Sequence, residues 1–106
     1  MKPEAEAEAR AVLRDAAEYI AEHGHAKGRF GGVNDEPACA IGALVGAAGS
    51  RNAARAAMDI VSRSLGATRS YAPAYITAWN DDPATSAEDV ILTLKRLGNE
   101  GVTHAP

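Results

Sequence analysis

The sequence has little of several residue types, and each shortage narrows the possibilities. Cys39 is the single cysteine among 106 residues, so the chain can form no internal disulfide and no cysteine-rich zinc site. Aromatic residues make up only 5% of the chain while alanine is abundant, a composition that suits closely packed helices better than a β-sandwich. Basic residues do not outnumber acidic ones, and the net charge of −3 is untypical of a nucleic-acid-binding domain.

Long apolar runs are also missing. The longest stretch without a charged residue, 37–50, has 14 residues, fewer than the roughly 20 that a helix needs to cross a bilayer. The first ten residues are acidic and contain no apolar core of a signal peptide. We therefore expect a soluble cytoplasmic protein with no membrane partner, in a setting where a free thiol stays reduced.

Apolar residues that recur every three or four positions predict an all-α fold. The expected helices lie at about 4–23, 37–49, 51–65 and 73–79, and a last one follows Thr85. We predict a small orthogonal helical bundle of four main helices plus one short helix, with the apolar helix at 37–49 in its centre. The alternative is an α+β fold with a short hairpin around 28–38, where glycine is frequent.

No linker divides the chain, so a single helical domain is expected over residues 1–98. Gly98 is expected just beyond the last helix, because glycine commonly follows a helix end. Residues 99–106 would then form a mobile C-terminal tail.

Polar residues indicate where two of the helices begin. Thr85 and Glu88 have the spacing of a capping box, so we expect them to open the last helix. Asp35 or Glu36 is expected to cap the central helix, with Pro37 in its first turn.

Within the central helix, Gly42 and Gly46 are four residues apart on a face of small residues. Each glycine inside a helix costs about 1 kcal/mol relative to alanine, so some contact must offset that cost. We expect close approach of another helix, with Gly42 and Gly46 as packing residues. Cys39 falls on the same face and is expected to be buried as a small core residue.

Five short motifs follow one another along the chain: "HG", "KGRF", "CAIGAL", "AWNDDP" and "TSAEDVILTL". With this order the chain resembles, over residues 11–97, a family of small domains of unknown function found in actinobacteria and their phages. The resemblance implies a mostly helical fold and an origin in those organisms or their viruses. It implies no activity, no cofactor and no catalytic residue.

An interaction function is favoured because the chain lacks a nucleotide-binding loop, a metal-ligand cluster and a supported catalytic constellation. We expect no cofactor and no bound metal, and a small intracellular protein-interaction module of phage origin that binds a host protein or a second copy of itself. The irregular, polar parts of a helical scaffold are where such a surface is expected. The candidate contact residues are Lys27, Arg29, Phe30, Trp79, Asn80 and Asp81.

Cys39 offers an alternative function, because a thiol near the start of a helix is stabilised as the thiolate. His25 or His23 would serve as the base. Asp81 or Asn80 would orient the imidazole, as in cysteine hydrolases. The alternative is therefore a Cys39-dependent hydrolase or transferase, although no oxyanion loop or nucleophile signature surrounds the cysteine.

Weak nucleic-acid binding is a second alternative. Residues 51–69 carry four arginines against one acid, Asp59. Arg51, Arg55 and Arg69 would contact phosphates. Arginines on a helix are as a rule its solvated face, and the whole chain is acidic, so nucleic acid is not the expected partner.

Overall fold

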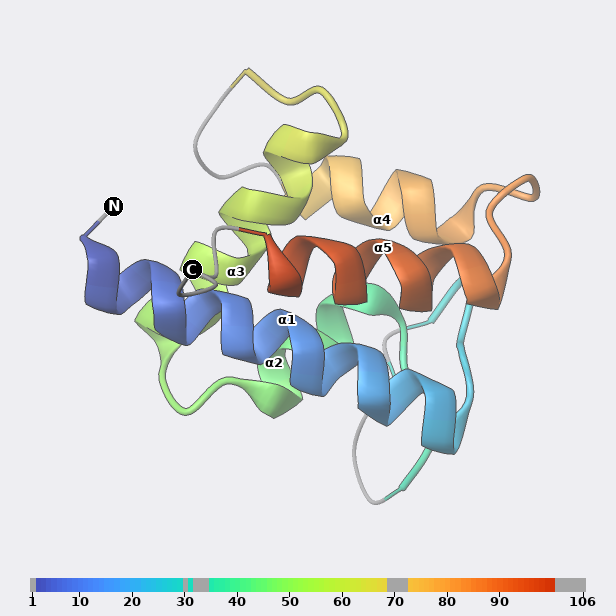
Figure 1. Cartoon of the computed structure of the whole chain (residues 1–106). Coiled ribbons are helices and arrows are strands. Elements are labelled where there is room, and N and C mark those ends of the chain that lie inside the picture. Colours follow the sequence, from blue (N-terminus) through green and yellow to red (C-terminus); the bar gives the residue numbers. More distant parts are fainter. Residues whose placement is uncertain (1, 30, 32–34, 69–72, 101–106) are drawn as a thin grey trace.

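Helices make up most of the computed structural model, which describes residues 2–29, 31, 35–68 and 73–100 (Figure 1). In chain order they are α1 (Pro3–His23), α2 (Ala40–Ala47), α3 (Arg51–Ser64), α4 (Pro73–Asp81) and α5 (Ala87–Asn99). These described residues contain no strand, only isolated bridges of Ala38 with His25 and Gly31. The all-α prediction is confirmed, and the α+β alternative is wrong for this part of the chain.

The first and last helices lie side by side and run in opposite directions, and α3 crosses them steeply (Figure 1). The face that α1 buries consists of Ala9, Val12, Leu13, Ala16, Ala17 and Ile20. The residues that α5 buries are Val90, Leu94, Leu97 and Gly98. Both sets recur every three or four positions, so each helix directs one apolar stripe into the domain.

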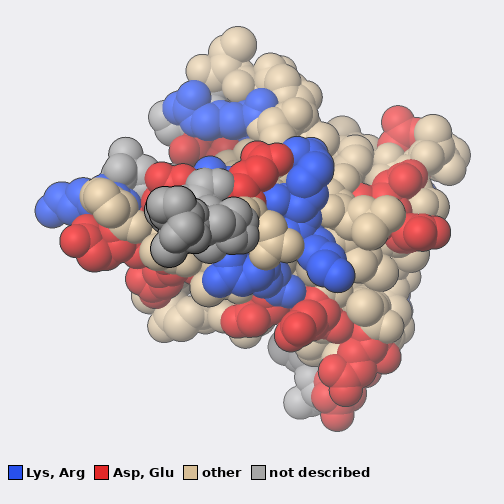
Figure 2. All heavy atoms as spheres, in the orientation of Figure 1, with Lys and Arg blue, Asp and Glu red and all other residues tan. Residues whose placement is uncertain are grey.

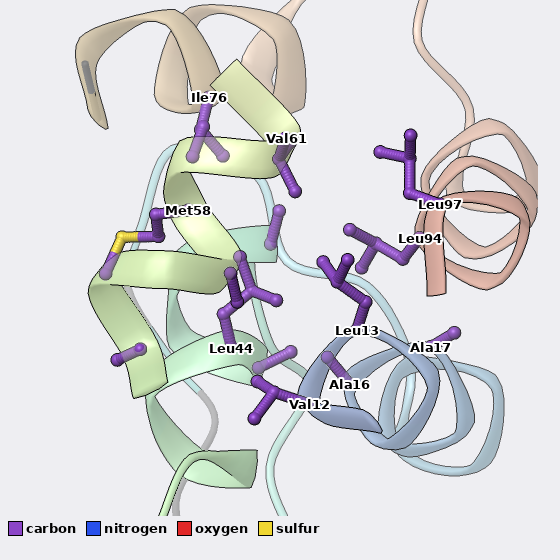
Figure 3. Close-up of a cluster of buried hydrophobic side chains, with 14 of the residues drawn as sticks. Val12, Leu13, Ala16, Ala17, Leu44, Met58, Val61, Ile76, Leu94 and Leu97 are labelled. Carbon is purple, nitrogen blue, oxygen red and sulfur yellow. The ribbon is translucent and has the colours of Figure 1, made fainter. Parts of the chain in front are cut away.

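The core forms where side chains from all five helices meet (Figure 3). Leu13 of α1 lies beside Leu94 of α5, and Leu44, Val61 and Ile76 come from the three remaining helices. Each of these five side chains is fully buried. Burying one such side chain contributes about 1.5–3 kcal/mol, so apolar burial determines how the helices are arranged.

At Gly98 the backbones of α1 and α5 approach closely. A Cβ there would lie 2.9 Å from the carbonyl oxygen of Arg10 and 3.0 Å from the backbone nitrogen of Arg14. The guanidinium groups of these two arginines donate hydrogen bonds to the carbonyl oxygens of Leu97 (2.8 Å) and Gly98 (2.5 Å). Those carbonyls belong to the last turn of α5, where C=O groups have no hydrogen-bond partner within the helix. This turn is also the negative end of the helix dipole. We call this contact the α1–α5 crossing.

The α2 helix spans 40–47 and is shorter at both ends than the helix predicted at 37–49. Ala38 explains the late start. Its carbonyl accepts a hydrogen bond from the Ala26 N–H (2.9 Å), and its N–H donates to the Gly24 carbonyl (3.0 Å). This pairing keeps the segment extended, so the helix begins only after it.

Cys39 is consequently the N-cap of α2. The prediction that Asp35 or Glu36 caps this helix, with Pro37 in its first turn, is wrong. All three residues precede the extended segment at Ala38, which separates them from the helix.

The capping box of α5 lies one residue later than predicted. The Ser86 hydroxyl accepts a hydrogen bond from the Asp89 N–H (3.0 Å), and the Asp89 carboxylate accepts one from the Ser86 N–H (2.9 Å). The expected pair of Thr85 and Glu88 is therefore wrong. Thr85 belongs to the preceding turn, where its N–H donates to the Asp82 carbonyl (2.9 Å).

The end of α5 also differs from the prediction. Gly98 lies inside the helix, which continues to Asn99 and is capped by Glu100. The predicted tail therefore overlaps the helix at its start, and residues 101–106 lie outside the described residues.

The two glycines of α2 differ in their surroundings. Gly42 is buried, whereas Gly46 is exposed beside Asp15 and Tyr19 of α1. Their role as packing residues stays a prediction. A backbone approach too close for a Cβ occurs at Gly98.

Candidate functional site

Three segments that are distant in the sequence meet toward the right of Figure 1: the loop 24–29 after α1, the start of α2 at 39–42 and the end of α4 at 79–82. Their sequences are "GHAKGR", "CAIG" and "WNDD". We call this place the Asn80 junction. It brings together residues from four of the motifs that carry the family resemblance.

Asn80 holds the junction together, and its side chain is buried at 2% exposure. Its Oδ1 atom accepts a hydrogen bond from the Ala40 N–H (2.9 Å) and lies 2.6 Å from Nε2 of His25. Its Nδ2 atom donates to the Ala26 carbonyl (3.0 Å) and to Oδ1 of Asp81 (2.9 Å). All four hydrogen-bonding positions of the amide are thus occupied, as a buried polar group requires.

These contacts also set the tautomer of His25. Asn80 Oδ1 can only accept, and the amide cannot be turned around because its nitrogen faces two acceptors. His25 Nε2 must therefore carry a proton. In the neutral ring, Nδ1 is then the acceptor that remains for another partner.

The loop contacts the end of α4 at two further points. Lys27 Nζ donates to the Asp82 carbonyl (2.6 Å), and the Gly28 N–H donates to the Asp81 carboxylate (2.9 Å). The hydrogen bond from Gly28 lowers the pKa of Asp81, with further lowering from Asn80 and from the positive charge of Lys27. Asp81 is therefore a carboxylate at neutral pH.

Cys39 is half-buried rather than fully buried, unlike the expected core residue. Its Sγ atom accepts a hydrogen bond from the Gly42 N–H (3.2 Å), in the first turn of α2. Because Cys39 is the N-cap and not part of the helix, the small face of α2 does not include it.

A pocket of about 270 Å³ opens at the junction. Its walls are formed by Gly28, Arg29, Cys39, Ile41, Thr77, Asn80 and Asp81. We call it the Asn80 pocket. Arg29 and Thr77 are exposed, and neither side chain has a hydrogen bond or ion pair to another residue that the structure describes. The pocket thus combines an apolar wall with a cation, a hydroxyl and a carboxylate.

Sequence reasoning had identified several of these residues. His25, Cys39, Asn80 and Asp81 all lie at the junction, together with Lys27 and Arg29. Trp79 is half-buried and packs against the core, and Phe30 lies outside the described residues. Thr77 was not among the predicted site residues. It lies three and four positions before Asn80 and Asp81, a spacing that places all three on the same side of a helix.

His23, the second histidine considered as a base, lies elsewhere. Its ring packs against Tyr19, with 4.4 Å between centroids, and its Nε2 atom is 3.7 Å from the Asp35 carboxylate. Of these two histidines, His25 is the one that contacts Asn80.

Basic side chains were considered as phosphate contacts. Arg51 and Arg55 line a groove between α2 and α3, and Arg69 lies outside the described residues. On the face shown in Figure 2, the Lys and Arg side chains over α1 and α5 have Asp and Glu on both sides, so the coloured residues form no continuous basic surface there.

Two other features are missing from the part of the chain that the structure describes. Its His, Cys, Asp and Glu side chains form no group of three suited to hold a metal ion. None of its helices has the length and apolarity that crossing a membrane requires.

Comparison with known proteins gives one match. The model of a protein family described as "Family of unknown function (DUF6197)" matches residues 4–100. No curated protein and no solved structure matches the chain.

Proposed function

Because the chain belongs to DUF6197, a family of unknown function, we propose a function from the site alone: a small protein-interaction module that binds a partner in the Asn80 pocket. The partner is a protein of the cell in which the chain acts. Two further expectations are part of this proposal: a cytoplasmic setting, from the missing apolar runs and the single cysteine, and a phage origin, which the resemblance in sequence implies.

One observation carries the proposal. Arg29 and Thr77, which have no hydrogen-bond partner among the described residues, line a pocket whose walls are held together by buried hydrogen bonds. Asn80 ties three walls of the pocket together through a buried amide. A site held in its binding conformation loses little entropy when the partner docks. Arg29 and Thr77 then supply a guanidinium and a hydroxyl for the partner's polar groups.

The size of the pocket supports a protein partner. A volume of about 270 Å³ lies just below the roughly 300–1,000 Å³ typical of small-molecule and cofactor sites. One or two side chains of a partner fill such a space. The Arg29 guanidinium suits an acidic side chain at the rim, and Ile41 suits an apolar one inside.

Pull-down with pocket variants tests the proposal. We expect wild-type protein to capture a partner from a lysate of an actinobacterial host, and Thr77→Arg and Arg29→Ala to lose it. Both positions are exposed, so both variants should fold. Thr68→Arg adds the same bulk and charge at an exposed threonine away from the pocket and serves as the matched control. Capture that is equal for all four proteins contradicts the proposal.

A second candidate function, thiol chemistry at Cys39, is favoured by a separate observation. Cys39 lines the same pocket, and the bond from His25 Nε2 to Asn80 Oδ1 leaves Nδ1 as the proton acceptor. Cysteine hydrolases use this combination of thiol, imidazole and amide. No hydrogen bond joins Cys39 to His25 within the described residues, so the imidazole has to approach the thiol before it can take its proton.

Iodoacetamide labelling of the folded protein across a pH series tests this candidate. If His25 activates Cys39, labelling is rapid at neutral pH, has a midpoint below the ordinary thiol value of about 8.5, and slows in His25→Ala. Labelling with an ordinary midpoint that is the same in both proteins removes thiol catalysis and leaves the interaction module untouched.

A further inference from the structure

A second hollow lies away from the Asn80 pocket, between the end of α2 and the first two turns of α3. Its volume is about 470 Å³. Apolar atoms of Val45, Ala48, Ala54 and Met58 contribute to it, together with the arginines at 51 and 55. Val45 is 45% exposed and so presents apolar surface at this hollow. We call this hollow the α2–α3 groove.

The charges on the groove are positive and regularly spaced. Arg51 and Arg55 are both exposed and stand one helical turn apart. Arg51 also lies in the first turn of α3, where the helix dipole adds positive potential. Carboxylates one turn apart, beside small or apolar side chains, would complement these charges and the apolar wall of the groove.

The start of α1 has this chemistry. Glu4 and Glu8 are exposed, stand one turn apart, and have no ion-pair partner among the residues that the structure describes. Glu6, between them in sequence, is already paired with Arg10 (2.9 Å). The exposed residues on this part of the helix also include Ala5 and Ala7, whose small side chains allow another surface to approach.

We propose that the α2–α3 groove binds the start of α1 of a second copy of this chain. The carboxylates at positions 4 and 8 meet the guanidinium groups at 51 and 55, and the alanines of α1 cover Val45. Because opposite charges meet at matched spacings, this contact is favoured over contacts that bring like charges together.

The arrangement of the two surfaces suits a symmetric dimer. The start of α1 and the start of α3 lie at the same end of the molecule, on the left of Figure 1. A two-fold axis at this end allows each copy to supply one α1 start and to receive the other. The contact then forms twice in one dimer.

Sedimentation equilibrium and light scattering from micromolar to millimolar concentration test the proposal. We expect a monomer–dimer equilibrium that shifts toward monomer at high salt, because salt screens the exposed charges. Glu4→Arg with Glu8→Arg should weaken association by about tenfold or more. Glu18→Arg with Glu22→Arg, exposed residues one turn apart at the other end of α1, should leave it unchanged.

Mixing two variants with complementary charge reversals is the decisive experiment. The variant Arg51→Glu with Arg55→Glu should also be monomeric, whereas its mixture with the Glu4→Arg, Glu8→Arg variant should form heterodimers, because both contacts then pair opposite charges. Circular dichroism checks that each variant is folded. A monomer at all concentrations, a dimer insensitive to these reversals, or a mixture that stays monomeric overturns the proposal.

Discussion

The α1–α5 crossing and the Asn80 junction both join segments far apart in the sequence, but by different physical means. At the crossing, apolar faces pack and glycine allows the backbones to touch, with Arg10 and Arg14 added at the rim. At the junction, a single buried amide makes four hydrogen bonds to three segments.

The two regions respond differently to the loss of one group. Apolar packing is shared among many atoms, and each contact contributes little by itself. A buried hydrogen-bond network is concentrated, because removing one partner leaves the others unsatisfied in a low-dielectric interior. The junction should therefore depend on one residue more strongly than the crossing does.

Asn80→Ala tests this difference with the largest expected effect. It leaves the Ala40 N–H and the Ala26 carbonyl without their partner in the interior, and we expect a loss of about 3 kcal/mol in the free energy of unfolding, measured in urea. Asn52→Ala, on the exposed face of α3, is the control and should change it by less than about 0.5 kcal/mol. A loss at Asn80 smaller than that at Gly98 would reverse the comparison.

Gly98→Ala tests the crossing. The new Cβ would lie within 3.0 Å of backbone atoms of Arg10 and Arg14. Overpacking of this kind costs about 1–3 kcal/mol and the gain in helix propensity is about 1 kcal/mol, so a net loss of up to about 2 kcal/mol is expected. Gly49→Ala, where no atom lies within 4 Å of a Cβ, should be nearly neutral. Stabilisation by Gly98→Ala would mean that α1 and α5 can separate without penalty.

Arg14→Met tests how much the hydrogen bond at the rim of the crossing contributes to stability. Methionine keeps the apolar stem but loses the hydrogen bond to the Gly98 carbonyl, and thermal and urea unfolding should show a loss of about 1 kcal/mol. Arg96→Met removes an arginine of α5 that forms an ion pair with the exposed Glu100, and should cost less than about 0.5 kcal/mol. Equal losses would show that the Arg14 contact is as weak as a surface ion pair.

Acidification tests the contribution of the Asp81 carboxylate to the stability of the junction, and we expect its effect to be smaller than those above. The pKa of Asp81 is lowered in the folded chain by the Gly28 N–H, so its contribution to stability is present above the unfolded value of about 3.9 and is lost as pH falls through the folded one. Urea unfolding of wild type and Asp81→Asn should differ at neutral pH. The difference should shrink below about pH 4. A difference that grows on acidification contradicts the sign of this shift.

The sequence predicts the crossing better than the junction, for a physical reason. Val90, Leu94 and Leu97 recur at helical spacing, so periodicity alone identifies α5 and its buried face. Gly98 was misplaced because a glycine near a helix end has two uses, as a stop signal and as a place of close approach. Which use applies depends on what the helix packs against, and the local sequence does not contain that information.

For the junction, the sequence predicts the residues and, in the thiol alternative, the contact of Asn80 with an imidazole, but not the burial of the amide. Asn80 follows Ile76 by four positions, so helical spacing directs both to the same face, and the structure buries both. Asparagine before two aspartates and a proline reads as a turn, because these residues bond their own backbone in turns. Burial of the amide became possible only because Ala26 and Ala40 bring unpaired backbone groups to it from distant parts of the chain.

The α1–α5 crossing also has a consequence for synthesis. Arg10 and its acceptor Leu97 are separated by 87 positions, so at about 5–20 residues per second roughly 4–17 s pass between their additions to the growing chain. The apolar stripe of α1 has no permanent cover from α5 during that interval. A nascent chain halted before α5 is made therefore leaves exposed to chaperones and proteases the part of this stripe that α2 and α3 do not cover.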